Sequence, residues 1–425
     1  MADSIQVSTS KRISLHEDWT VVILGFLIII LTIAGFVIPV PSFSWKNSEE
    51  LFGKVLSAEN LGKAVLQFVF VFAIALMAVY LINKSVKSAL KTFPLLFALT
   101  FIALVLSGNS EVKALNLESV IFSLSIGLVV SNVFKLPTWM RESLSAELFV
   151  KIGLVLLGTG VIFSDILKAG GLGLIQALVV VLSVWYFAFW ICKKLKVDEE
   201  LTMMISSAVS ICGVSAAIAT AGAIKGDTKK LSYVISLVLI TAIPMMIFMP
   251  YIARYFHFPE AVTGAWLGGS IDTTGAVVAS GTLVGETALK ISTIVKFSQN
   301  VLLGLAAFAI SIYWTYSKRT NGDKNNVAKP TLGLIWERFP KFVLGFVAAS
   351  LLFSFVVNAE TISTVKDSLK SVQALWFVLA FTSIGLETKF SDLFNSNSKK
   401  PLYGFLIAQT FNILVTLVIA YFLFG

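Results

Sequence analysis

The chain is short of charge, histidine and cysteine, and each shortage excludes a class of protein. Charged residues make up 13% of the 425 residues, about half the usual share in a soluble domain. The two histidines, His16 and His257, lie near the ends of apolar segments, so a histidine metal site or a Ser-His-Asp triad within a bilayer is not expected. The two cysteines, Cys192 and Cys212, have no metal-ligand spacing and predict no disulfide framework.

Motifs of enzymes and of ATP-driven pumps are also missing. An intramembrane aspartyl protease needs two deep aspartates, whereas only Asp272 lies deep in an apolar segment. The chain has no His-Glu-x-x-His motif for a metalloprotease and no Gly-Lys-Ser/Thr motif for ATP binding. We therefore expect no enzyme, no catalytic residue and no cofactor, apart from Na⁺ or H⁺ as a coupling ion.

Apolar segments dominate what is present. Hydrophobic residues make up 57% of the chain, and a membrane-spanning helix needs about 20 mainly apolar residues. The sequence predicts an all-α polytopic membrane protein with a cytoplasmic tail over 1–19, additional N-terminal spans over 20–117 and a transporter region over 118–425. Thirteen segments meet the criterion: 20–40, 63–82, 92–108, 118–134, 147–164, 171–192, 200–224, 231–253, 261–284, 288–314, 341–358, 371–388 and 400–424.

The distribution of basic residues predicts the orientation. The net charge of +9 comes from Lys and Arg in short loops without a basic face, so nucleic acid is not an expected partner. Because basic loops stay in the cytoplasm, we expect a multi-pass protein of the cell (inner) membrane, with the N-terminus cytoplasmic and the C-terminus outside. This distribution does not decide whether the segments 200–224 and 261–284 cross the membrane or re-enter as hairpins.

Those two segments become less hydrophobic within regions that are predicted to lie in the membrane. Residues 206–220 and 264–281 are rich in Gly, Ser, Thr and Ala, and the second stretch contains Asp272. Irregular backbone is tolerated at membrane depth only where it is buried in protein or lines a cavity. The two stretches therefore predict discontinuous helices that meet near the middle of the membrane, as in secondary transporters, with Gly213, Gly269 and Gly275 as break points.

Two internal similarities indicate an inverted repeat. Gly158 with the run 163–165 (Phe-Ser-Asp) recurs as Gly385 with the run 390–392, and each ends an apolar helix. The pattern Gly-x-x-x-Gly-Asp/Glu-Thr follows both polar segments, at 222–228 and 281–287. Paired interruptions with internal repeats are typical of inverted-repeat transporters.

The same residues resemble a known family. The run Ser210-Ile211-Cys212-Gly213, the later Gly269-Ser270 and the run 277–281 (Val-Val-Ala-Ser-Gly) look like the YeiH-type sulfate exporter family (UPF0324-like), from about Glu118 to the C-terminus. That family groups with the superfamily of cation:proton antiporters and bile-acid:sodium symporters. The resemblance implies ion-coupled transport by an elevator-type movement of a core domain against a scaffold, and a homodimer by analogy.

The chain departs from the family pattern at two places. Asp272-Thr273 stands where a His-Glu pair is usual, and Gln299 stands three positions after Lys296 where a basic residue is usual. The loss of one cation weakens the expectation that the substrate is a doubly charged oxyanion such as sulfate.

Asp272 and Lys296 are the leading site candidates. A carboxylate in the middle of a bilayer costs about 3 kcal/mol, so Asp272 is expected to bind Na⁺ or to carry a proton, or to pair with Lys296. Lys296 is expected to contact an anion, to pair with Asp272 or to reach toward the interface. The full candidate set for substrate and ion is Ser207, Ser210, Cys212, Gly213, Val214, Ser215, Gly269, Ser270, Asp272, Thr273, Thr274, Lys296 and Gln299.

Three functions remain open at this stage. The first is a secondary active transporter that moves a small anion (sulfate, a sulfonate or a similar organic anion) by alternating access, coupled to Na⁺ or H⁺. The second is a cation/proton antiporter in which Asp272 and Lys296 exchange partners. The third is a channel, which fits less well because a pore needs a continuous polar lining.

Overall fold

Long helices make up most of the protein. The computed structural model describes residues 15–115, 118–320, 333–389 and 399–425, and the described residues contain helices and no β-strand. Eight helical stretches in this part of the chain are long and apolar enough to cross a membrane: α3 (Ala58–Leu81), α4 (Val86–Ser107), α7 with α8 (Thr138–Gly160), α9 (Phe163–Lys194), α12 (Thr228–Tyr255), α15 (Glu286–Thr320), α18 (Ala359–Glu387) and α19 (Lys400–Phe424).

The remaining predicted segments are shorter. Three of them form the apolar helices α1 (Glu17–Ile33), α6 (Ser119–Val133) and α17 (Lys341–Leu351). The short helices α2 (Ser48–Glu50), α5 (Ser110–Ala114) and α16 (Gly333–Arg338) lie between longer ones. The other two predicted segments are each split into a pair of half-helices.

Both polar segments break inside the stretches that the sequence predicts to be discontinuous. The first forms α10 (Glu199–Ser210) and α11 (Val214–Ile224), and the second forms α13 (Glu260–Ser270) and α14 (Thr274–Val284). At a rise of 1.5 Å per residue each half-helix is about 17 Å long, roughly half of a hydrocarbon core of about 30 Å. We call α10 with α11 hairpin 1 and α13 with α14 hairpin 2, with tips at residues 211–213 and 271–273.

Hairpin 1 enters and leaves at the same end of α12. The backbone N–H of Asp227, just before α12, donates to Glu200 at the start of α10 at 3.1 Å. Lys230 in the first turn of α12 forms ion pairs with Asp198 at 2.8 Å and with Glu200 at 3.2 Å. The N–H groups of Lys230 and Lys229 also donate to the exposed carboxylate of Asp227 and hold its pKa below the usual range. The two half-helices of this segment therefore form a hairpin, with both of its ends at the start of α12.

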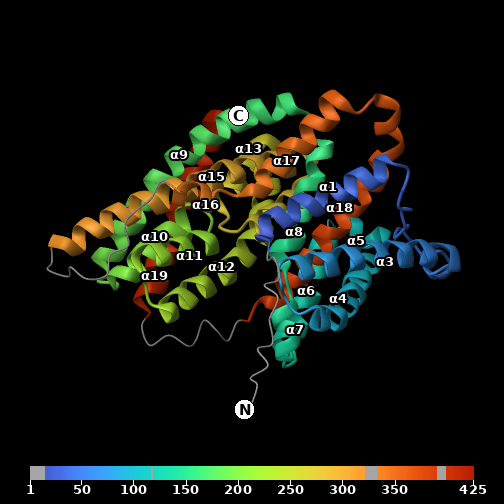
Figure 1. The fold of residues 1–425 in the computed structure, drawn as a ribbon, viewed down its shortest axis with the longest axis horizontal. Coiled ribbons are helices and arrows are strands. Elements are labelled where there is room, and N and C mark those ends of the chain that lie inside the picture. The colour runs from blue at the N-terminus through green and yellow to red at the C-terminus, as the bar shows by residue number, and fades with distance from the viewer. Residues whose placement is uncertain (1–14, 116–117, 321–332, 390–398) are drawn as a thin grey trace, which may run out of the picture.

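Hairpin 2 enters and leaves at the opposite end of α12. Arg254 in the last turn of α12 donates to the carbonyl of Leu283 at the end of α14. A methyl group added at Gly285, after α14, would lie 3.0 Å from Glu260 at the start of α13. The two hairpins thus enter from opposite ends of one membrane-spanning helix, and in Figure 1 α10 and α11 lie at the lower left while α13 lies at the top.

The two ends of the described chain lie on opposite faces. The carboxylate of Asp18 in α1 accepts from the N–H of Lys341 at 2.9 Å, next to Arg338, which lies near α11 of hairpin 1. At the other end, the ring of Tyr421 in α19 contacts Phe258 at the mouth of hairpin 2, with ring centroids 5.5 Å apart. The tail over 1–14 and the predicted repeat over 390–392 lie outside the described residues.

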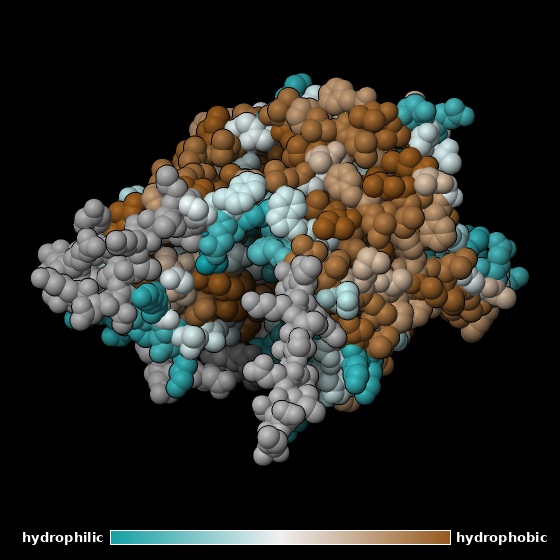
Figure 2. All heavy atoms as spheres, viewed as in Figure 1, coloured by the Kyte–Doolittle hydropathy of each residue, from teal (hydrophilic) through white to brown (hydrophobic). Residues whose placement is uncertain are grey.

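Helices α8 and α18 pack against each other, and both face α12 and the hairpins. Helices α18 and α6 approach closely because Gly127 and Gly385 face each other, and a side chain at either would meet the other's backbone within 3.0 Å. Figure 2 shows a mainly hydrophobic surface with a hollow near the centre of this face, bordered by hydrophilic residues. This combination is expected of a membrane protein that contains a polar interior path.

Candidate functional site

The tips of the two hairpins touch each other in the interior. Gly213 at the tip of hairpin 1 has φ 52° and ψ −106°, a conformation that residues with a side chain avoid. A methyl group at this position would lie 2.5 Å from Val238 and 3.1 Å from both the side chain and the carbonyl oxygen of Asp272. Glycine at 213 therefore permits both the turn and the contact between the hairpins.

We expect Gly213→Ala to destabilise the protein. The backbone conformation costs about 1–3 kcal/mol for a residue with a side chain, and the new methyl group would push Val238 and Asp272 apart. The apparent melting temperature of the purified variant in detergent should fall, while Gly222→Ala should leave it unchanged, because a methyl group there meets only Arg338 at 3.5 Å. Equal melting temperatures for Gly213→Ala and the wild type would contradict this account of the tip.

Lys296 of α15 joins both tips through their carbonyl groups. Its Nζ donates to the carbonyls of Ile211 and Ile271 at 2.8 Å each, and to Oε1 of Gln299 at 3.0 Å. The last carbonyls of a helix have no partner within the helix and carry partial negative charge. The ammonium group therefore satisfies the C-terminal ends of α10 and α13 at once, and its side chain is 1% exposed.

Three amide side chains donate to further carbonyls near the ends of the same two half-helices. Gln299 donates to Gly269 at 2.9 Å, and Gln409 of α19 donates to Ser270 at 2.8 Å. Asn412 of α19 donates to Ser270 at 3.2 Å and to Val209 of α10 at 3.0 Å. The broken C-terminal ends are thus closed by donors from α15 and α19, which makes their burial tolerable.

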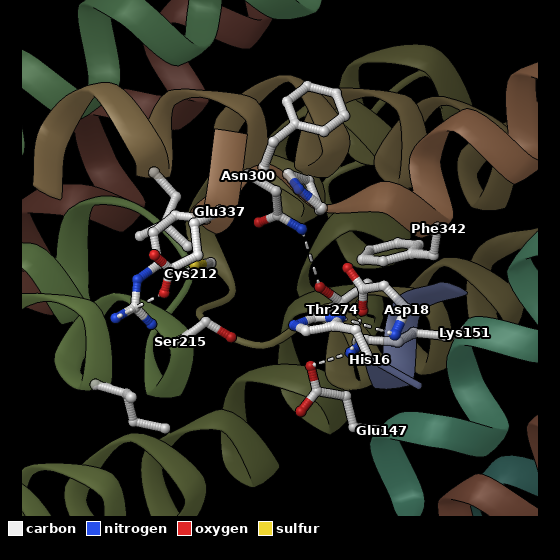
Figure 3. A pocket seen from close by; sticks show the side chains of 15 residues that line it. His16, Asp18, Glu147, Lys151, Cys212, Ser215, Thr274, Asn300, Glu337 and Phe342 are labelled. Atoms are coloured by element: carbon white, nitrogen blue, oxygen red, sulfur yellow. Dashed lines mark hydrogen bonds and ion pairs between the residues drawn. The ribbon is translucent and has the colours of Figure 1, made fainter. Parts of the chain in front are cut away.

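The N-terminal ends of α11 and α14 have a different environment, because they face a cavity. Two neighbouring hollows of about 200 Å³ each share five lining residues: Glu147, Lys151, Cys212, Ser215 and Thr274. Val214 and Thr273 line the second hollow. Figure 3 shows Cys212, Ser215 and Thr274 around the first hollow, with Asn300 donating to Thr274 at 3.3 Å.

Free N–H groups at these ends make the cavity favourable for an anion. The first N–H groups of a helix have no partner within the helix and carry partial positive charge. The N-cap residue of α11 is Gly213, which has no side chain to cap it, whereas Thr273 caps α14 by accepting from Ala276 at 3.3 Å. Helix N-termini that face a cavity in this way are a recurrent site for anionic groups.

Asp272 lies behind this cavity and does not line either hollow. Its side chain is 2% exposed, and its Oδ2 has no hydrogen-bond partner among the described residues. Lys296 donates its three hydrogen bonds elsewhere, so the two residues form no direct ion pair in the part of the chain that the structure describes. Asp272 is therefore a buried carboxylate between the tips, in contact with Gly213 rather than with the cavity.

Apart from Asp272 and Gly213, which lie between the tips, the predicted site residues fall into three groups. Cys212, Val214, Ser215, Thr273 and Thr274 line the cavity. Lys296, Gln299, Gly269 and Ser270 belong to the covered C-terminal ends. Ser207 and Ser210 bond back to their own helix, to Met203 at 3.0 Å and Ser206 at 2.7 Å. Of the predicted break points, Gly213 lies at a break, whereas Gly269 lies in the last turn of α13 and Gly275 in the first turn of α14, so the prediction was wrong for these two glycines.

The charged wall of the cavity was not predicted from the sequence. The first hollow is lined by Lys151 and Glu147 of α8, Asp18 of α1 and Arg338 at the end of α16. Glu147 and Lys151 are one helical turn apart inside a predicted span, and this spacing was the available signal. The amides of Gln409 and Asn412 were also missed, because their partners are backbone carbonyls far away in the sequence.

These features define a class: an all-helical, multi-pass membrane protein in which two re-entrant hairpins meet beside a polar cavity. A family model described as conserved hypothetical protein 698 matches residues 66–404. The chain belongs to this family, whose relatives carry the name UPF0324 membrane protein, and this confirms the resemblance read from the motifs around residues 210–213 and 269–281.

Several relatives are similar over the same region. The UPF0324 membrane protein RB9488 of Rhodopirellula baltica is 40% identical over 314 residues, which cover 71% of this chain and 57% of the relative. A UPF0324 membrane protein of Nitratidesulfovibrio vulgaris is 39% identical, with 71% of this chain and 54% of the relative covered. The chain thus spans little more than half the length of these curated relatives. No solved structure matches it.

Proposed function

We propose that the protein is a secondary active transporter of a small anion such as sulfate or a sulfonate, coupled to H⁺ or Na⁺. One observation carries the proposal: the N-terminal ends of α11 and α14 face a common cavity, while the C-terminal ends of α10 and α13 are covered by Lys296 and amide groups. The polar groups of the tips that face the cavity are therefore N–H donors, which favour an anion.

Asp272 is the proposed coupling group. A buried carboxylate with an unpartnered oxygen can take up a proton or an alkali cation, and Ser270 and Gln409 beside it also have buried oxygens without a described donor. Because Asp272 touches the tip of hairpin 1 through Gly213, a change of its charge would alter the contact between the hairpins. This is how ion binding would be coupled to access from the two faces.

The cavity fits an arrangement open toward the face at which hairpin 1 enters. Its outer lining residues, His16, Asp18 and Arg338, lie at that face, which the positive-inside rule makes cytoplasmic. In the proposed cycle this is the inward-facing arrangement, and alternating access would bring the tips into contact with the other face.

Thermal stability across a ligand panel tests the proposal. The detergent-purified protein is heated with sulfate, sulfite, methanesulfonate or isethionate, each as the Na⁺ or K⁺ salt at pH 6 and pH 8. A ligand that binds only the folded state stabilises it, by about 2.7 kcal/mol at a hundred times its Kd, so at least one anion should raise the melting temperature and Na⁺ or low pH should enhance the shift. Shifts from cations alone would favour the cation/proton antiporter instead.

Transport kinetics separate a carrier from a channel. In proteoliposomes the anion that gives the largest shift should be taken up with saturation and should show counterflow, because each turnover requires a conformational change. Flux that rises without saturation and shows no counterflow would favour the channel.

A further inference from the structure

Lys151 is the most unusual charged residue of the cavity. It lies on α8 inside a membrane-spanning stretch, is 8% exposed and lines both hollows. Its Nζ contacts three carboxylates: Glu17 at 2.8 Å, Asp18 at 2.9 Å and Glu147 at 2.9 Å. Figure 3 shows Lys151 with Asp18 and Glu147 beside Thr274.

Three carboxylates on one ammonium group exceed what a structural ion pair requires. A buried lysine needs one well-placed carboxylate to compensate its charge, so this cluster carries two surplus negative charges. The neighbouring groups His16, Glu337 and Arg338 also line the first hollow, and their basic and acidic members largely offset each other. The surplus negative charge therefore lies at the wall of a cavity whose inner end favours an anion.

The three carboxylates differ in how firmly they are held. Asp18 is fixed, because its second oxygen accepts from the N–H of Lys341 at 2.9 Å and its side chain is 9% exposed. The side chains of Glu17 and Glu147 are 32% and 61% exposed. Their exposure lets them leave Lys151 for water, and each is a flexible chain that ends, like a sulfate or sulfonate, in negatively charged oxygens.

We propose that Lys151 is a substrate-binding residue of the cavity, and that Glu17 and Glu147 occupy it until a sulfate or sulfonate anion displaces them. This inference rests on the proposed anion transport and names the cation that receives the substrate. Glu17 lies on α1, outside the residues that match the family model, so this occupant is an addition to the matched region. The Lys151 ammonium group keeps its hydrogen bonds throughout, because oxygens of the bound anion replace those of the displaced carboxylates.

A cysteine reporter in the cavity tests the assignment without relying on transport. Ile218 of α11 lines the first hollow and is 42% exposed, so Ile218→Cys provides an accessible thiol once Cys192 and Cys212 are replaced by serine. The full-length protein is treated with anionic, cationic and neutral methanethiosulfonate reagents, and the ratio of anionic to cationic modification rates reports the charge of the cavity.

Removing one charge should move this ratio in opposite directions. Lys151→Gln should lower it about threefold to tenfold and Glu17→Gln should raise it by a similar factor, because a unit charge a few ångströms away contributes about 1 kcal/mol in water. Glu59→Gln is the matched control and should leave the ratio unchanged. Glu59 also pairs with a lysine, Lys63, at 2.7 Å, but it does not line the cavity. The neutral reagent should react equally with all variants, and a parallel change in its rate would overturn the proposal by showing altered packing.

Protection by sulfate, methanesulfonate or isethionate measures binding at Lys151 directly. The measured quantity is the anion concentration that gives half-maximal protection of the reporter. It should be about tenfold higher in Lys151→Gln, unchanged in Lys151→Arg and lower in Glu17→Gln. Equal protection of Lys151→Gln and the parent protein would overturn the assignment of Lys151 and leave anion transport standing. A charge-dependent reagent ratio without protection by any anion would instead overturn the proposed function and the substrate role of Lys151 with it.

Discussion

Replacing Lys296 with methionine should disrupt the contact between the two hairpin tips, lower the stability of the protein and strongly reduce transport. The substitution keeps the length and apolar stem of the side chain but removes the donor shared by Ile211, Ile271 and Gln299. At about 1 kcal/mol or more for each buried acceptor left without a donor, the loss is about 3 kcal/mol. The melting temperature in detergent should fall by several degrees, and uptake into proteoliposomes should fall at least about tenfold, since 1.4 kcal/mol already changes a population tenfold.

Lys290 on the same helix provides the control. It pairs with Glu286 at 3.0 Å one turn away, and partly exposed pairs of this kind contribute about 0.3–0.5 kcal/mol. Lys290→Met should therefore behave as the wild type does in both measurements. A Lys296→Met protein with wild-type stability and transport would show that the carbonyls of the two tips find other donors.

Asp272→Asn should produce the opposite combination, a protein that is more stable and inactive. Asparagine has the same shape, so the contact with Gly213 remains, while a buried carboxylate with an unpartnered oxygen, whose charged form is costly in the interior, is removed. A charge in the middle of a bilayer costs about 3 kcal/mol, and part of that cost should return as a higher melting temperature. Uptake of the panel anions should fall to background, because the variant has lost the group proposed to carry the coupling ion.

The response to Na⁺ and pH distinguishes coupling from a packing role. In the wild type one of these conditions should enhance the thermal shift given by the anion, and in Asp272→Asn that enhancement should be absent even if the anion still binds. Asp165→Asn, a change at an exposed carboxylate in the first turn of α9, should leave both responses intact. Asp272 has no coupling role if its asparagine variant transports at the wild-type rate.

The hairpins could be located from the sequence because their cause is local. Runs of Gly, Ser, Thr and Ala remove the bulk that holds a membrane helix straight, and both breaks fall inside the two predicted stretches. Their direction could not be predicted, because the flanking Lys and Arg residues are nearly balanced between the two arrangements. It is decided by contacts such as Asp227 to Glu200, which join residues 27 positions apart.

The roles of the polar side chains were harder to predict, because their partners are backbone groups or distant residues. Lys296 was expected to meet an anion, Asp272 or the interface, and in the structure it donates to two carbonyls, whose sequence identity carries no information. Lys151 was hidden because the surrounding span is apolar on average, while its partner Glu17 lies 134 residues earlier. Residue type predicted that polar groups lie in the membrane, and only the fold shows what each of them faces.

The covered ends of the hairpins also constrain how the protein can be made. A half-helix of 11 or 12 residues is too short to be held in a bilayer as a span, and its bare carbonyls cannot rest in hydrocarbon. Yet Lys296 follows its partner Ile211 by 85 residues, and Asn412 follows Val209 by 203 residues. We therefore expect hairpin 1 to settle in the lipid core only after α15 and α19 have been synthesised. In this sense α19, far along the chain from hairpin 1, supplies the donor that lets the hairpin stay in the membrane.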